Sequence, residues 1–423
     1  MARIVITTIG SYGDLHPYIA LGLGLQSRGH DVAIATSESY RAKVVAGGLR
    51  FSPIRPNLDD FGPFVEIARR VYDPRKGAEY IVRELLLPSL ARSFDDLQAA
   101  AGSADLLVTH ALSYAGHLLG RSQAVRWIST VLSPMVFLSI HDPPPLAPAP
   151  WLRTLHRLNP ILYRLVFSGL KAFARTWSAP VRQFCKERGL PLPFQDPLFE
   201  GQFSPLMTLA MFSPLLARPQ RDWPRHTHLT GFPMYDADQV EPGSIEALEG
   251  FLASGAPPIV FTLGSSAIYD AGDFYRQALD ISQRLGRRAV LLTGKVEENQ
   301  RLPPLPSSIH ATEYVPHSQI FPRAAAIVHQ GGIGTLAQAM HAGRPMLVMP
   351  LSHDQPDNAL RVERMGIAKR IPRARFSVRS GETALRELLE DARYGAAATE
   401  VALRLRAEDG VGAACDRLES VLG

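Results

Sequence analysis

Residues 325–340 have the sequence AAIVHQGGIGTLAQAM, in which an apolar run passes through closely spaced glycines into a helical pattern. This arrangement can bind an anion, because glycine lets the backbone approach a phosphate and the new helix presents free N–H groups. His329 and the hydroxyl of Thr335 add hydrogen-bond donors. A P-loop lysine is missing and the spacing differs from G-x-G-x-x-G, so triphosphate hydrolysis and ordinary dinucleotide binding are not expected. The alternative interpretation is a tight strand-to-helix connection that needs glycine.

Similar apolar, β-branched runs recur along the chain, and most are followed by a turn and a helical pattern. In the first half, the expected strands are residues 4–9, 31–36, 49–54, 105–110, 124–129, 207–212 and 227–232. In the second half, they are residues 258–265, 288–293, 309–314, 325–329 and 345–350. Since 423 residues are enough for two cores, we expect an α/β fold of two doubly wound domains. The active site is expected between them, where the carboxyl ends of the strands face each other.

The composition of the chain sets the domain boundaries. Residues 233–258 are rich in Asp, Glu, Gly, Ser and Pro, which is typical of a linker. We expect a first domain at 1–215 with a helical insertion at about 141–190, a linker region at 216–257, and a second domain at 258–400. We expect a final helix at 401–423, which can cross back to the first domain.

The overall composition excludes several classes of protein. Apolar residues make up 46% and charged residues 20%, a globular composition rather than a disordered one. The net charge of +5 is spread along the chain, so nucleic-acid binding is not expected. Cys185 and Cys415 are the only cysteines and lack a ligand spacing, which argues against a disulfide framework and a zinc site. No apolar run is long enough for a membrane span or a signal peptide, so we expect a cytoplasmic protein.

Residues 151–177 carry apolar side chains at a spacing of three to four, with basic residues on the other sides. Three interpretations stay open: a helical insertion packed on its own domain, a wall of an apolar ligand pocket, and an interfacial membrane helix at the inner face of the membrane. The richness in Leu, Phe and Trp suits an apolar acceptor with one nucleophilic hydroxyl. We assign Phe137 and Trp151 to binding of that acceptor.

Polar groups follow three further strands. Asp354 and Gln355 supply adjacent acceptors and donors suited to sugar hydroxyls, although a helix N-cap would place Asp354 there as well. Tyr314, followed by Val315, offers a ring that could stack on a base, although a tyrosine at such a place is more often part of the core. Asp14 follows the first strand and could take a proton from a bound hydroxyl, or could cap the helix that begins near Leu15.

Together these residues carry a resemblance. The whole chain resembles the family 1 glycosyltransferases of GT-B fold, in which two Rossmann-like domains face each other across a cleft. The likeness rests on GSYGDLHP at 10–17, the turn at 329–335, the pair Asp354 and Gln355, and their spacing. Within that family the chain is most similar to the bacterial rhamnosyltransferases that make rhamnolipids from dTDP-rhamnose and hydroxyalkanoyloxyalkanoates. The segments with this likeness are 222–224, 229–233, 261–265, 272–275 and 353–359.

The resemblance implies a role for each matching residue. Asp14 takes the place of the general base. Donor binding is implied for Ser265, Tyr314, Val315, His329, Gly331, Gly332, Gly334, Thr335, Asp354 and Gln355. Plant-type members instead use a histidine in the first loop supported by a later aspartate, and no carboxylate stands near Thr109 and His110 here. We therefore expect His110 to hydrogen-bond the acceptor or Asp14, and Tyr314, standing where tryptophan is usual, to stack more weakly.

The function expected from the sequence is a hexosyl transfer with inversion, without a metal or a cofactor. The helix near Gly334 and His329 would stabilise the charge of the leaving diphosphate. The favoured reaction moves rhamnose from dTDP-rhamnose to a lipid-like hydroxy acid. The alternative uses UDP-glucose or another nucleotide sugar and an aromatic or polyketide secondary metabolite. Two rival classes are a GT-B nucleotide-sugar epimerase and a non-catalytic partner protein.

Overall fold

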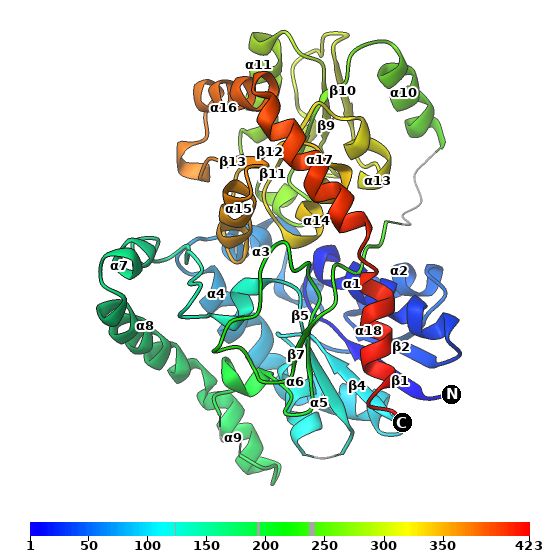
Figure 1. Cartoon of the computed structure of the whole chain (residues 1–423). Coiled ribbons are helices and arrows are strands. Elements are labelled where there is room, and N and C mark those ends of the chain that lie inside the picture. Colours follow the sequence, from blue (N-terminus) through cyan, green and yellow to red (C-terminus); the bar gives the residue numbers. More distant parts are fainter. Residues whose placement is uncertain (123, 193–194, 237–241) are drawn as a thin grey trace. The chain divides into compact units, whose positions relative to one another are not determined.

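The computed structural model describes residues 1–122, 124–192, 195–236 and 242–423, and divides into two units (Figure 1). The first unit contains Met1–Tyr235 and Asp409–Gly423, and the second contains Asp236–Glu408. Residues 237–241 of the expected linker lie outside the described residues. The first unit continues to Tyr235 because the segment at 227–229 adds a strand to its sheet.

The first unit is built on a seven-stranded parallel sheet with the order β3-β2-β1-β4-β5-β6-β7. Its strands are β1 (Arg3–Thr7), β2 (Asp31–Thr36), β3 (Arg50–Pro53), β4 (Leu106–Thr109), β5 (Trp127–Val131), β6 (Thr208–Ala210) and β7 (Thr227–Leu229). The apolar run of β1 is fully buried, as a strand covered by helices on both faces requires. The helices are α1 (Tyr12–Ser27), α2 (Arg41–Ala46), α3 (Phe64–Val71), α4 (Gly77–Tyr80), α5 (Leu90–Ala101), α6 (Tyr114–Arg121), α7 (Leu152–Leu158), α8 (Pro160–Ala174), α9 (Ala179–Glu187) and α18 (Gly410–Glu419).

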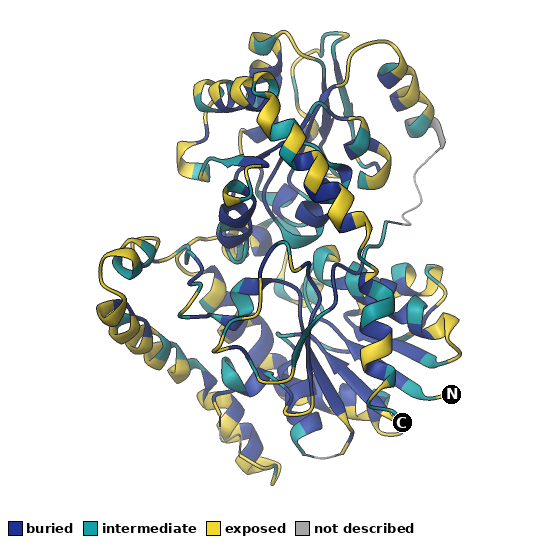
Figure 2. Ribbon diagram, viewed as in Figure 1, coloured by how far each residue is buried: buried dark blue, intermediate teal, exposed yellow. Residues whose placement is uncertain are grey.

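The second unit contains a six-stranded parallel sheet with the order β10-β9-β8-β11-β12-β13. Its strands are β8 (Ile259–Thr262), β9 (Ala289–Leu292), β10 (Ile309–Thr312), β11 (Ala326–His329), β12 (Met346–Val348) and β13 (Ala368–Arg370). Its helices are α10 (Pro242–Ala253), α11 (Phe274–Leu285), α12 (Glu297–Gln300), α13 (His317–Ile320), α14 (Ile333–Ala342), α15 (Gln355–Arg364), α16 (Val378–Glu390) and α17 (Ala392–Arg406). Both sheets consist mainly of buried residues, while exposed residues line the outer sides of the helices (Figure 2).

The predicted α/β fold of two doubly wound units is confirmed. Strand β13 was not predicted, because it is only three residues long and contains Lys369 and Arg370. In each sheet the strand order reverses at one point, between β1 and β4 in the first unit and between β8 and β11 in the second. The loops after these strands lie at the carboxyl ends of a parallel sheet, where open α/β folds bind ligands.

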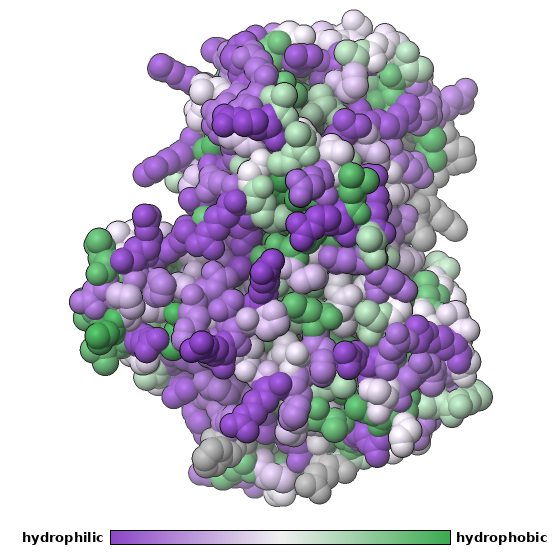
Figure 3. Space-filling model, viewed as in Figure 1, coloured by the Kyte–Doolittle hydropathy of each residue, from purple (hydrophilic) through white to green (hydrophobic). Residues whose placement is uncertain are grey.

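The insertion contains three α-helices, α7, α8 and α9, and the first two are separated by a break at Asn159. Asn159 ends α7 and caps α8, because its side-chain oxygen accepts a hydrogen bond from the Leu162 N–H at 3.0 Å. Pro160 explains the break, since proline lacks an N–H and disfavours a helical conformation in the residue before it. Tyr163 and Phe167 on the inner side of α8 join a small buried cluster with Ala149 and Leu152. Hydrophobic side chains also gather on the surface over α7 and α8, beside hydrophilic ones (Figure 3).

The C-terminal helix α18 packs on α1 of the first unit. The Arg28 guanidinium at the end of α1 bonds the carboxylates of Asp416 at 2.5 Å and Glu419 at 2.8 Å. Gly24 makes this close approach of the helices possible. A Cβ at position 24 would lie 2.4 Å from Val411 Cγ1 and 3.0 Å from Cys415 Sγ.

We expect Gly24→Leu to lower the free energy of unfolding of the first unit by about 1–3 kcal/mol, because the new side chain would push α18 away from α1. The measurement is the unfolding transition by calorimetry. The matched control is Gly395→Leu on α17, where a Cβ meets nothing within 4 Å. That change should be neutral or slightly stabilising, since leucine favours a helix over glycine by about 1 kcal/mol. Equal losses in both variants would contradict the packing role of Gly24.

Candidate functional site

Asp14 and His110 lie next to each other at the switch point of the first sheet. Asp14 lies in the first turn of α1, and His110 directly follows β4. The distance between Asp14 Oδ1 and His110 Nε2 is 3.6 Å. The His110 side chain is buried, whereas 32% of the Asp14 side chain is exposed. The structure thus places an accessible carboxylate beside a buried imidazole.

The carboxylate of Asp14 also stabilises the start of α1. The N-cap is Ser11, and Asp14 is the third residue of the helix rather than the cap. Asp14 Oδ2 accepts hydrogen bonds from the Ser11 N–H at 2.7 Å and from the Ser11 hydroxyl at 3.1 Å, which completes a capping box. Gly10 has a φ of +140°, and a Cβ there would lie 2.3 Å from Asp14 Oδ2. The capping contacts occupy Oδ2, so Oδ1 is the oxygen that faces His110.

The His110 imidazole is neutral, and its Nε2 faces Asp14. Its Nδ1 accepts a hydrogen bond from the Leu112 N–H at 3.3 Å, so the ring proton resides on Nε2, toward Asp14. Burial lowers the pKa of His110, and the nearby Asp14 carboxylate only partly opposes this effect. The ring is therefore uncharged at neutral pH and can orient the Asp14 carboxylate without neutralising it.

The glycine turn before α14 lies at the switch point of the second sheet, directly after β11. Gly331 has a φ of +87°, and a Cβ there would lie 2.8 Å from Val348 Cγ1, so both conformation and space require glycine. The N-cap of α14 is Gly332, and among the described residues no side chain caps this helix. The first amides of α14, including those near Gly334 and Thr335, are therefore available to an anion.

The buried side chain of His329 stabilises the glycine turn through a hydrogen bond to its backbone. The His329 side chain is fully buried, Nδ1 accepts a hydrogen bond from the Gly331 N–H at 3.1 Å, and Nε2 lies 3.3 Å from Met346 Sδ. Burial lowers the pKa of His329 to about 3, so the ring is neutral. Both ring nitrogens are engaged within the fold. The contact with a diphosphate expected from the sequence stays a prediction.

The loop between β12 and α15 is tied to the glycine turn by Asn358, a residue that the sequence analysis missed. Asn358 Nδ2 donates to the Gly331 carbonyl at 3.0 Å and to Asp354 Oδ2 at 2.8 Å. Asp354 is half-buried and makes no side-chain bond that caps α15. Gln355 is buried, and its Oε1 accepts from the Leu351 N–H at 2.9 Å, so this oxygen supports the loop. Asp354 is thus the more accessible of the predicted pair.

The other predicted donor residues follow β8 and β10 at the same edge of the sheet. Ser265 is exposed after β8. Tyr314 is half-buried, and its hydroxyl lies 3.5 Å from Asp236 Oδ1. Val315 is fully buried, which leaves its backbone as the part able to face a base. The proposed stacking on Tyr314 stays a prediction.

Gln330 is a second residue that the sequence analysis passed over. It is buried between the β8 loop and the glycine turn, since a Cβ at Gly264 would lie 2.4 Å from Gln330 Nε2 and 3.2 Å from Thr335 Oγ1. Within the described part of the chain, Gln330 Oε1 has no hydrogen-bond partner. A buried oxygen without a partner is costly unless a ligand supplies a donor. Glutamine carries no sequence signal for this placement, because only tertiary packing creates it.

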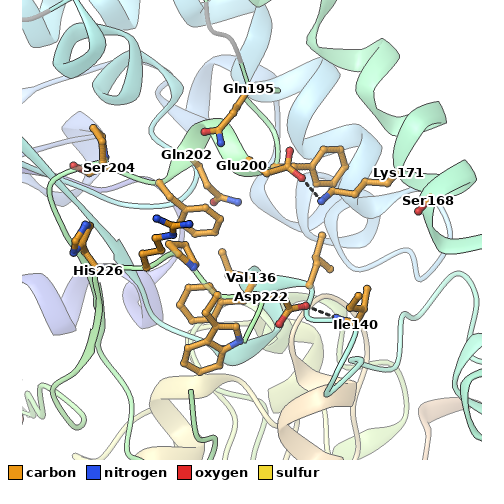
Figure 4. Close-up of a pocket in the computed structure, with 18 of the residues that line it drawn as sticks. Val136, Ile140, Ser168, Lys171, Gln195, Glu200, Gln202, Ser204, Asp222 and His226 are labelled. Atoms are coloured by element: carbon orange, nitrogen blue, oxygen red, sulfur yellow. Dashed lines mark hydrogen bonds and ion pairs between the residues drawn. The ribbon is translucent and has the colours of Figure 1, made fainter. Parts of the chain in front are cut away.

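A cavity of about 630 Å³ lies in the first unit, between the segment after β5, α8 and the segments before β6 and β7 (Figure 4). Phe137 lines it, stacked on Trp223 at 4.1 Å between ring centroids and on Phe203 at 5.6 Å. Polar groups in the wall include the ion pair of Lys171 and Glu200. Of the three residues assigned to the acceptor, Phe137 lines this cavity. Trp151 is instead exposed on the surface, and His110 lies beside Asp14.

Two features bear on metals and membranes. Over the described ranges, no group of three or more His, Cys, Asp or Glu side chains is arranged to hold a metal ion. No helix in the described part of the chain is both long and apolar enough to cross a membrane.

Two family models match the chain. Residues 4–89 match the N-terminal domain of glycosyltransferase family 28, and residues 281–411 match the C-terminal domain of erythromycin biosynthesis protein CIII-like proteins. The first match contains Asp14, and the second contains the glycine turn and the loop with Asp354.

Individual proteins match over nearly the whole chain. An O-mycaminosyltylonolide 6-deoxyallosyltransferase of Streptomyces fradiae is 32% identical, covering 99% of this chain and 97% of that protein. A sterol 3-beta-glucosyltransferase of Debaryomyces hansenii is 26% identical over 97% of this chain, which spans 26% of that protein's length. The solved structure of the spinosyn rhamnosyltransferase SpnG with thymidine diphosphate is similar with a TM-score of 0.69 and 18% identity, covering 99% of this chain and 100% of that one.

These matches favour relatives named for tylonolide, erythromycin and sterols over the rhamnolipid-synthesising subfamily suggested by the sequence motifs. The fold, the two family models and the full-length relative agree with one another. The chain belongs to the family 1 glycosyltransferases, enzymes of GT-B fold.

Proposed function

We propose that this glycosyltransferase moves a 6-deoxyhexose from a thymidine diphosphate sugar to a hydroxyl of a rigid, apolar secondary metabolite, with inversion and without a metal. The observation that carries the proposal is the accessible Asp14 carboxylate beside the neutral N–H of His110, at 3.6 Å. A carboxylate held in this way can act as a general base toward an alcohol.

The proposed reaction is a single displacement. Asp14 Oδ1 takes the proton of the acceptor hydroxyl while the oxygen of that hydroxyl bonds to the anomeric carbon of the donor sugar. At the same time, the bond from the anomeric carbon to the diphosphate oxygen breaks. We expect His110, whose Nε2 lies 3.6 Å from Asp14 Oδ1, to orient the carboxylate during the reaction. The capping bonds from Ser11 to Oδ2 fix the carboxylate from the other side. Rigid placement of this kind contributes to the rate because the base needs no reorganisation.

The leaving diphosphate is stabilised by backbone groups in the second unit. The uncapped amides of α14 and the positive end of its dipole favour negative charge that grows as the bond breaks. Asp354 and Gln355 remain the residues proposed to bind sugar hydroxyls, and Tyr314 and Ser265 those proposed to face the nucleoside. Metal independence is proposed because backbone amides can supply the charge stabilisation that a divalent cation supplies elsewhere.

The names of the relatives and the cavity support the substrate classes. One relative is named for a 6-deoxyallosyl group and tylonolide, another for sterols, and SpnG is named as a rhamnosyltransferase with bound thymidine diphosphate. The cavity beside Phe137 and Trp223 is lined by stacked aromatic rings, which suit a rigid apolar body. We therefore favour a macrocyclic or polycyclic alcohol over a lipid hydroxy acid.

We expect a donor and acceptor screen to give a product mass shift with dTDP-rhamnose or another dTDP-6-deoxyhexose and a macrolide or steroid alcohol. In parallel assays, UDP-glucose replaces the dTDP-sugar as the donor, and a 3-hydroxyalkanoate ester replaces the macrolide or steroid alcohol as the acceptor. Activity should persist in EDTA. Transfer only to the lipid acceptor would overturn the proposed acceptor class. Release of an epimerised sugar without any acceptor would favour the epimerase instead.

Asp14→Asn should lower kcat by about 10²–10⁴-fold, because asparagine keeps an oxygen for the Ser11 N–H but has no basicity. The dissociation constant for dTDP, measured by calorimetry, should stay unchanged. Ser11→Ala is the matched control: it removes the hydroxyl contact and should cost about 0.5–2 kcal/mol of stability while keeping the carboxylate and most of kcat. If the loss of kcat in both variants only matched their loss of folding stability, Asp14 would have a capping role and would not be the base of the reaction.

His329→Ala should weaken dTDP binding about tenfold or more, because the buried Gly331 N–H would lose its acceptor. His329→Asn, which can supply an oxygen near the position of Nδ1, should bind better than the alanine variant. Since the pKa of His329 is about 3, the ring stays neutral from pH 5.5 to 8, and the ratio of wild-type to His329→Asn affinity should not change over that range. A ratio that rises as the pH falls through about 6.5 would show instead a charged histidine that contacts the diphosphate.

A further inference from the structure

The outer face of α7 and α8 is apolar although it is exposed. Leu158 is 80% exposed, Ile161 74%, and Leu165 and Phe173 66% each. Ile161 and Leu165 lie four residues apart, so they share one face of α8. On the opposite face, Tyr163 and Phe167 are buried in the first unit. A surface helix normally presents polar residues outward, so α8 departs from the pattern of a helix that only covers a core.

The charge of this region has one sign. Between Asp142 and Glu187 the sequence contains five arginines and two lysines but no acidic residue. Some of these cations form ion pairs with carboxylates outside the helices, as Lys171 does with Glu200 and Arg182 with Asp196. Arg157 and Arg164 are exposed, and among the described residues no carboxylate pairs with them. An uncompensated positive charge therefore accompanies the apolar face.

We propose that α7 and α8 bind the surface of a membrane that contains anionic lipids. In this binding mode a short amphipathic helix lies in the plane of the interface, with its apolar face among the upper acyl chains and its cations at the lipid phosphates. Leu158, Ile161, Leu165 and Phe173 form the apolar face, and Arg157 and Arg164 meet the headgroups. The helix lies on the membrane and does not cross it, in keeping with its 15 residues.

The charge distinguishes this occupant from others. A second copy of the chain would bring the same cations together, and like charges across an interface oppose association. A neutral apolar partner would leave Arg157 and Arg164 without a role. An anionic lipid surface satisfies the cations and the apolar face at once, because it presents both chemistries in one plane.

The inner side of the same helix reaches the cavity of the first unit. Phe167, Ser168 and Lys171 line that cavity, while Ile161 and Leu165 face outward. One helix thus borders both the proposed lipid surface and the cavity. The membrane proposal depends only on the outer face and holds whatever molecule the cavity binds.

The test is co-sedimentation of the full chain with vesicles of phosphatidylcholine mixed with phosphatidylglycerol, and with vesicles of phosphatidylcholine alone. We expect at least about tenfold stronger binding to the mixed vesicles, and a loss of this preference at high salt. Absence of binding to both kinds of vesicle would overturn the proposal.

Two double variants separate the apolar and the charged contributions. Ile161→Glu with Leu165→Glu should reduce binding more than tenfold, and Arg157→Gln with Arg164→Gln should remove the preference for phosphatidylglycerol. The control is Leu403→Glu on α17, which is 63% exposed in the second unit and should bind as the wild type does. Circular dichroism and dTDP binding report on folding. Vesicle binding that is unchanged in both double variants would overturn the proposal. So would a wild-type protein that binds no vesicles but forms a dimer, if Ile161→Glu with Leu165→Glu alone converts that dimer to a monomer.

Discussion

The positions of Asp14, His110 and the glycine turn before α14 follow from the parallel arrangement of both sheets. Parallel strands are connected through helices, which brings the carboxyl ends of all strands to one edge of the sheet. This arrangement occurs in both units of the chain. The first sheet reverses its order between β1 and β4, and the loops after these strands carry Asp14 and His110. The second sheet reverses between β8 and β11, and the loop after β11 carries the glycine turn. The backbone order alone therefore brings together residues far apart in sequence, such as Asp14 and His110.

At the first switch point, the Asp14 carboxylate combines an observed capping contact with its proposed role as a base. The two carboxylate oxygens of Asp14 make different contacts. Oδ2 accepts the hydrogen bonds from Ser11 that form the capping box of α1, and Oδ1 faces Nε2 of His110. The neutral state of His110 matters, because a charged imidazole would form an ion pair and weaken Asp14 as a base. Burial keeps the imidazole neutral, since it lowers the pKa of His110. The fold thus places Asp14, the proposed base, beside an uncharged neighbour.

The sequence predicts the two sheets well, because strands buried on both faces leave continuous apolar runs such as the one in β1. It also predicts the turn before α14, since closely spaced glycines between an apolar run and a helical pattern are typical of a tight strand-to-helix turn. What it misses depends on tertiary contacts. Asn358 links two loops, Gln330 is enclosed between two others, and His329 turns its ring inward. Each of these three is a polar residue without periodicity, and only the packing of neighbouring strands decides whether it faces a ligand or the core.

The insertion shows a different limit of sequence reasoning. Apolar residues at a spacing of three to four predict a helix with one buried face, yet α8 divides its apolar side chains between two faces. Tyr163 and Phe167 account for the packing of α8 on the first unit, whereas Ile161 and Leu165 lie outside this packing and are exposed. Exposed leucine or isoleucine residues are unremarkable when they are scattered, but these lie together and beside arginines that pair with no carboxylate of the described residues. A surface that is both apolar and positively charged is complementary to a partner that is both apolar and negatively charged. An anionic lipid surface presents both properties in one plane, because its charged headgroups lie above apolar acyl chains.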